Sequence, residues 1–121
     1  MTQTAKAHPI SIERSSNRVR VHCNGRVVAD SRSALTLREA SLRPVQYIPR
    51  EDVDMTMLER TSHRTHCPFK GDASYYTLSL DGQVAENAAW TYEDPYPGVA
   101  AIKDHLAFYP ERVDKIEELP G

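Results

Sequence analysis

Two dipeptides, Asn24-Gly25 and Asp81-Gly82, constrain the fold of this chain more than any other feature. A two-residue type I′ turn needs positive φ at both central residues, which Asn, Asp and Gly tolerate. Apolar and polar residues alternate before the first dipeptide, Arg26 to Asp30 follow it as the returning strand, and extended runs flank the second dipeptide. The sequence therefore predicts two tight β-hairpins, one over residues 19–30 and one over 75–90, and hence antiparallel pairing.

Further alternation, with a period of two residues, marks other extended segments. Residues 10–12 continue into 19–23 as one first strand, and the remaining strands are expected at 35–38, 45–48, 61–67 and 113–119. Helical spacing of apolar residues predicts one or two helical turns within 50–60 and a short amphipathic helix over 99–106. The expected fold is mainly β, a single compact antiparallel β domain with one or two short helices.

The length of 121 residues suits one domain. We expect a disordered tail at 1–8, because this stretch has no apolar period, and a single β domain over 9–121. The mean hydropathy is −0.57, and no window approaches the roughly 18 apolar residues of a membrane span. The sequence therefore predicts no membrane partner and a cytoplasmic protein.

Charge is divided unevenly along the chain. Residues 1–50 hold nine Lys or Arg and three Asp or Glu, whereas residues 51–121 hold six and fourteen. The isoelectric point of about 6.2 is too low for a general binder of duplex nucleic acid, for which a value above about 9 is typical. The two halves either neutralise each other within one fold or pair between the protomers of a homodimer.

The two cysteines, Cys23 and Cys67, form no Cys-x-x-Cys pair, which excludes a disulfide-rich scaffold and a four-thiolate zinc site. On a strand over 61–67, His66 and Cys67 point to opposite faces, so they should not share a metal ion. His63 and Cys67 share a face, but a site there would need ligands from elsewhere. No metal site and no cofactor are predicted.

The segment 62–71 is the densest in reactive side chains. Nearby Arg64, His66 and Lys70 would favour a thiolate at Cys67, which makes this cysteine a candidate nucleophile. Lys70 precedes Gly71, a pair that suits an anion, although no Walker-type phosphate loop is present. The structural alternatives are a small buried thiol at Cys67 and a solvated Lys70 in a turn.

Two other patterns suggest binding. Asp52 and Asp54 have the spacing that can hold Mg²⁺ on a strand, but in a helical turn their side chains diverge and face solvent. Trp90 and Tyr92 share one strand face, where they either line a pocket for a planar or cationic ligand or cover the core.

Taken in order, five strings resemble one known family: Gly25 to Ser31, Tyr47 to Val53, Cys67 to Gly71, Ala89 to Tyr92 and Ala107 to Tyr109. The chain is similar, from about residue 10 to 119, to the bacterial domain-of-unknown-function family number 427, sometimes labelled nucleotidyltransferase-like. The resemblance implies a β-tent-like fold, similar to methionine sulfoxide reductase and Mss-type zinc proteins. Those relatives hold zinc with two Cys-x-x-Cys knuckles, which this chain lacks, so zinc is not implied.

The leading hypothesis is a small-molecule pocket for an anionic or planar ligand. Its walls would be Tyr47, Trp90 and Tyr92, and its anion anchors Lys70 and Arg64. Any catalysis would use Cys67, as the nucleophile, and Lys70. The family signature adds Asp52 to the ligand-binding set and leaves open whether the protein is an enzyme. One alternative is a non-catalytic interaction module in which Trp90 and Tyr92 form an aromatic cage. The other is a Mg²⁺-dependent nucleotide-handling enzyme that uses Asp52 and Asp54, although a nucleotidyltransferase needs convergent carboxylates that are otherwise missing.

Overall fold

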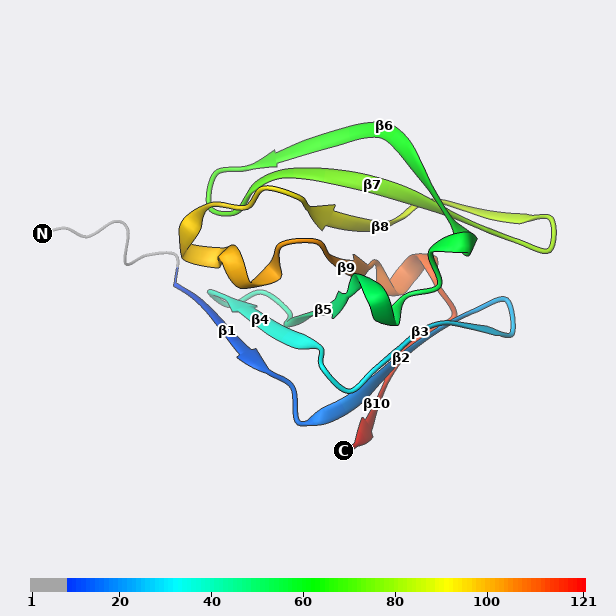
Figure 1. Cartoon of the computed structure of the whole chain (residues 1–121), viewed down its shortest axis with the longest axis horizontal. Helices are drawn as coiled ribbons and strands as arrows, with labels where there is room; N and C mark the ends of the chain where they lie inside the picture. Colours follow the sequence, from blue (N-terminus) through cyan, green and yellow to red (C-terminus); the bar gives the residue numbers. More distant parts are fainter. Residues whose placement is uncertain (1–8) are drawn as a thin grey trace, which may run out of the picture.

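The computed structural model describes residues 9–121, which form two antiparallel β-sheets joined by turns and short 3-10 segments (Figure 1). The tail expected at 1–8 lies outside the described residues. The larger sheet has seven strands in the order β1 (Ile10–Arg14), β4 (Leu35–Glu39), β5 (Val45–Pro49), β9 (His105–Phe108), β8 (Gln83–Tyr92), β7 (Gly71–Leu80) and β6 (Leu58–Cys67). The smaller sheet has the order β10 (Lys115–Pro120), β2 (Asn17–Cys23) and β3 (Arg26–Ser31).

This architecture confirms the predicted fold class: it is mainly β, antiparallel and consistent with a β-tent-like domain. Both predicted hairpins are present. Asn24 and Asp81 adopt φ of 52° and 48°, and the glycines after them 75° and 82°. In Figure 1 the tips of the β2–β3 and β7–β8 hairpins extend to the same side of the molecule, where Arg26 and Asp81 approach to 3.4 Å.

The first expected strand is two strands in different sheets. The break lies at Ser15 and Ser16, where the chain leaves β1 of the larger sheet and enters β2 of the smaller one. The N–H of Ser15 donates to the carbonyl of Ala34 at 2.9 Å, and the Ser15 hydroxyl accepts from the N–H of Asn17 at 3.1 Å. Serine hydroxyls that bond to nearby backbone favour turns over strands, so this pair ends β1.

The helical expectations are met only as 3-10 turns. Within 50–60 the chain forms η2 (Arg50–Asp52) and η3 (Met55–Met57), the latter capped by the carboxylate of Asp54. The amphipathic helix expected over 99–106 is wrong: the chain forms η4 (Pro97–Ile102), kinked at Val99, and then enters β9. None of the helical segments in the part of the chain that the structure describes is long and apolar enough to cross a membrane.

The apolar residues of 99–106 have helical spacing but pack in two different buried clusters, which is why the spacing predicted a helix wrongly. Val99 and Ile102 pack in one buried cluster with Leu37, Tyr47 and Tyr92, whereas Leu106 packs in the other. That other cluster lies between the two sheets, where side chains of β2 and β3 meet those of β5, β7, β8 and β9. The larger sheet is therefore buried on both faces near β9, which positions the site described next.

Candidate functional site

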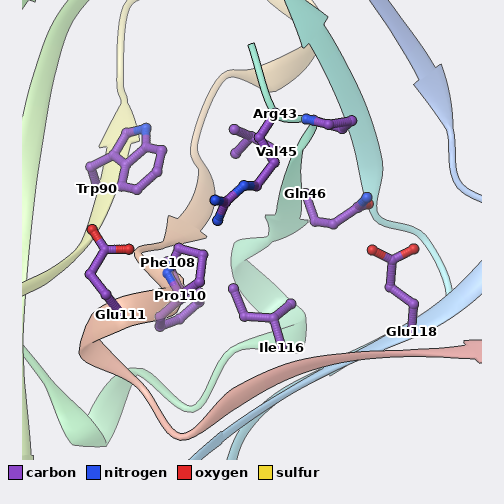
Figure 2. Close-up of a pocket in the computed structure, with 10 residues that line it drawn as sticks. Arg43, Val45, Gln46, Trp90, Phe108, Pro110, Glu111, Ile116 and Glu118 are labelled. Carbon is purple, nitrogen blue, oxygen red and sulfur yellow. The ribbon is translucent and has the colours of Figure 1, made fainter.

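A cleft of about 640 Å³ lies beside the middle of the larger sheet and reaches the smaller sheet (Figure 2). Strands β5, β8, β9 and β10, the loop before β5, and η5 (Pro110–Arg112) contribute its walls. The lining residues are Arg43, Pro44, Val45, Gln46, Trp90, Phe108, Pro110, Glu111, Ile116 and Glu118. Figure 2 shows the Arg43 guanidinium directed into the space bounded by Trp90 and Ile116.

Trp90 is the one predicted wall residue that lines this cleft. Its indole N–H donates to the hydroxyl of Tyr47 at 3.2 Å, and its ring lies 4.5 Å from that of Tyr109. Ala107 is the residue opposite Trp90 on β9, and its small side chain leaves room for Tyr47 on β5 to reach across to β8. The contacts with Tyr47 and Tyr109 thus hold one side of the indole in place, while the other side remains open to the cleft.

Tyr47 and Tyr92 lie behind Trp90 in the buried cluster rather than in the cleft wall. Their side chains are 1% and 5% exposed, and their rings are 6.5 Å apart. Burial raises the pKa of both phenols well above the ordinary value of 10.0, and the hydrogen bond from Trp90 only partly offsets this for Tyr47. Tyr92 and Trp90 share a strand face as predicted, but they form no exposed aromatic cage.

Lys70 and Cys67, the candidate catalytic residues, lie together at another place. The ammonium group of Lys70 donates to the carboxylate of Glu39 at 2.5 Å, and both side chains are nearly buried. The half-buried Cys67 packs against the cluster that contains Tyr47 and Tyr92. The structure therefore brings both residues near that cluster, but neither lines the cleft.

Arg64 and Asp52 lie at two further places on the surface. Arg64 is exposed on β6 and borders a polar hollow with Thr61, His63 and Asn87. The Asp52 carboxylate accepts a hydrogen bond of 2.7 Å from the hydroxyl of Ser31.

The two aspartates of the possible Mg²⁺ site have separate partners. Asp52 binds Ser31, whereas Asp54 caps η3 through the backbone N–H and hydroxyl of Thr56. Across residues 9–121 no three His, Cys, Asp or Glu side chains converge as a metal site requires.

Sequence reasoning missed most of the cleft. Phe108 lies in β9, whose first two residues were predicted to end a helix over 99–106, and Ile116 and Glu118 lie in the C-terminal strand β10. One signal did exist: the first half of the chain is rich in arginine, a residue suited to bidentate contacts with anions, and Arg43 stands beside Pro44 just before a strand. Nothing local distinguished Arg43 from the other seven arginines there.

A family model described as a domain of unknown function (DUF427) matches residues 11–119, nearly the whole chain. No curated protein sequence matches the chain.

Proposed function

The chain belongs to the DUF427 family, and on that premise we propose that it binds a small planar molecule carrying a negative charge, and that the cleft at Trp90 is the binding site. The observation that carries the proposal is the combination of an open indole surface and the Arg43 guanidinium in one cleft. The proposal is one of binding rather than catalysis, because Cys67 and Lys70 do not line this cleft.

The size and lining of the cleft support a small organic ligand. A volume of about 640 Å³ lies within the range of roughly 300 to 1,000 Å³ that is usual for such sites. Trp90, Phe108, Val45 and Ile116 supply apolar surface from four different strands. An aromatic ring placed against the indole would gain both the burial of apolar area and a ring contact.

Three charged residues line the cleft, Arg43, Glu111 and Glu118, and the Arg43 guanidinium is the one that supports an anionic group on that ligand. Within the described part of the chain no carboxylate pairs with the Arg43 guanidinium, whereas Glu118 accepts a hydrogen bond of 3.4 Å from the side-chain amide of Asn17. Arginine binds carboxylates and phosphates through two parallel N–H donors. We therefore assign Arg43 as the anion anchor in place of Lys70, whose ammonium group is already bound to Glu39.

Trp90 offers a direct test because it is the single tryptophan of the chain. We expect 3-phenylpropionate to change the intrinsic fluorescence in a saturable manner, and 3-phenylpropylamine, which has the opposite charge, to have little effect. A hydrogen-bonded charge contact of about 1.5 to 3 kcal/mol corresponds to roughly ten-fold or more in Kd, so Arg43→Gln should weaken binding by at least that factor.

Arg64→Gln is the matched control, because Arg64 is an exposed arginine outside the cleft. It should leave the Kd unchanged. Equal affinity of the Arg43→Gln and Arg64→Gln proteins would contradict the assignment of the anchor. The absence of any saturable signal with 3-phenylpropionate, benzoate, phenyl phosphate and N-acetylphenylalanine would contradict the proposed function.

A further inference from the structure

The cleft lies where the pairing between two neighbouring strands of the larger sheet ends. Strands β5 and β9 pair through only two residue pairs, Ile48 with Leu106 and Pro49 with His105. Continued in the same register, the next pairs would be Tyr47 with Ala107 and Gln46 with Phe108, and the structure has neither pair. Gln46 and Phe108 instead line the cleft. The gap between these two strands is therefore part of the cleft.

Strand register shows which main-chain groups face this gap. In an antiparallel pair, the N–H and C=O of one residue point to the same neighbour, and those of the next residue point the other way. The N–H of Tyr109 donates to the carbonyl of Ala88 beyond the end of β8–β9 pairing, at 2.9 Å. Ala107 therefore also bonds toward β8, and the N–H and C=O of Phe108 point toward β5.

The same alternation places the main chain of Gln46. Leu106 lies two residues before Phe108, so its main-chain groups also point toward β5. Its pair with Ile48 is therefore a hydrogen-bonded one. Gln46 lies two residues before Ile48 on β5, so its N–H and C=O also point toward β9, across the gap. Each side of the cleft thus presents one donor and one acceptor of the kind that strand edges use to capture an extended segment.

We propose that the ligand of this cleft contains a secondary amide next to its carboxylate, as an N-acylated aromatic α-amino acid does, with the amide bonded to the main chain of Gln46 or Phe108. This inference rests on the proposed function, because both place the aromatic ring of the ligand at Trp90 and its carboxylate at Arg43. Two sources share this chemistry: a free N-acyl amino acid and the C-terminal residue of a peptide.

The test compares two ligands that differ in one group. N-acetylphenylalanine has the amide N–H, and O-acetyl-3-phenyllactate has an ester oxygen in its place, with the same ring and carboxylate. A neutral hydrogen bond contributes about 0.5 to 1.5 kcal/mol net, so the amide should bind about two- to ten-fold more tightly when both are titrated against Trp90 fluorescence. In addition, the ¹⁵N–¹H signals of Gln46 and Phe108 should shift with N-acetylphenylalanine.

The outcomes separate this inference from the proposed function. If the amide and the ester bind equally, or if 3-phenylpropionate binds and N-acetylphenylalanine does not, the inference is wrong and the proposed function stands. If none of these three ligands binds, and benzoate and phenyl phosphate do not bind either, the proposed function itself fails. Arg43→Gln should weaken the binding of the amide and of the ester by the same factor, so the ratio of their Kd values should stay the same. If the two Kd values become equal in this variant, the preference for the amide depends on Arg43, and the assignment to the main chain is overturned.

A last arm distinguishes the two sources. The tripeptide Gly-Ala-Phe extends the N-acetyl group into a peptide chain. Binding as tight as that of N-acetylphenylalanine, or tighter, supports the inference and assigns a peptide C-terminus. Weaker binding supports it with a free N-acyl amino acid as the ligand, because the cleft then does not accommodate the chain that precedes the amide.

Discussion

The nearly buried ion pair between Lys70 and Glu39 should be one of the costliest contacts to break. The pair joins the turn between β6 and β7 to the end of β4, 31 residues earlier. The two side chains are only 10% and 12% exposed. Removing one member of a buried pair leaves the other charge in a poorly solvated place, at a typical cost of 3 to 5 kcal/mol. We expect Lys70→Met to lower the free energy of unfolding by about 3 kcal/mol, near the lower limit because some solvent reaches the pair.

Urea unfolding followed by circular dichroism measures this change. For a chain of this length, about 3 kcal/mol should also lower Tm by roughly 10 °C. The double variant Glu39→Gln with Lys70→Met should recover most of the loss, because the charges of both members of the pair are then removed together.

Lys115→Met is the matched control for the same chemical change on the surface. Lys115 is 59% exposed and lies 3.6 Å from Glu117, an arrangement for which a cost of about 0 to 1 kcal/mol is typical. If Lys70→Met costs no more than Lys115→Met, the Lys70 pair is not a buried structural contact and the reasoning fails.

Two pH dependences follow from the shifted pKa values. Burial raises the pKa of Tyr47 and Tyr92, so the stability they contribute is complete below pH 10 and falls as the pH rises further, because the unfolded chain releases protons that the folded one keeps. Urea unfolding at pH 9, 10 and 11 should show a slope approaching about 1.4 kcal/mol per pH unit for each phenol, and Tyr92→Phe should remove one share; an unchanged slope would contradict the assignment. The hydrogen bond from Arg18 lowers the pKa of Asp30, so the stability it contributes is present above about pH 4 and is lost as the pH falls through the folded-state pKa. Asp30→Asn should flatten the unfolding profile between pH 5 and 2, and an identical acid profile in this variant would argue against the pair.

Local backbone chemistry is what the sequence by itself determined. Positive φ at Asn24-Gly25 and Asp81-Gly82 is set by those residues alone, and the alternation before the first of them needs no distant partner. The two hairpins, the antiparallel class and the shared face of Trp90 and Tyr92 were therefore predictable. The strand at 105–108 was not, because a short central strand buried on both faces has no alternation and its apolar residues matched a helix by chance.

The tertiary structure alone decided the site. Trp90 and Tyr92 have the same strand face and similar chemistry, but Val99 and Ile102 of η4 pack in the cluster that buries Tyr92, while the loss of pairing between β5 and β9 leaves Trp90 open. Lys70, which the sequence predicts as an anchor for an anionic ligand, donates a hydrogen bond to the carboxylate of Glu39 within the fold. Each outcome depends on which distant segment covers a side chain, and that is set by sheet order and register rather than by neighbours in the sequence.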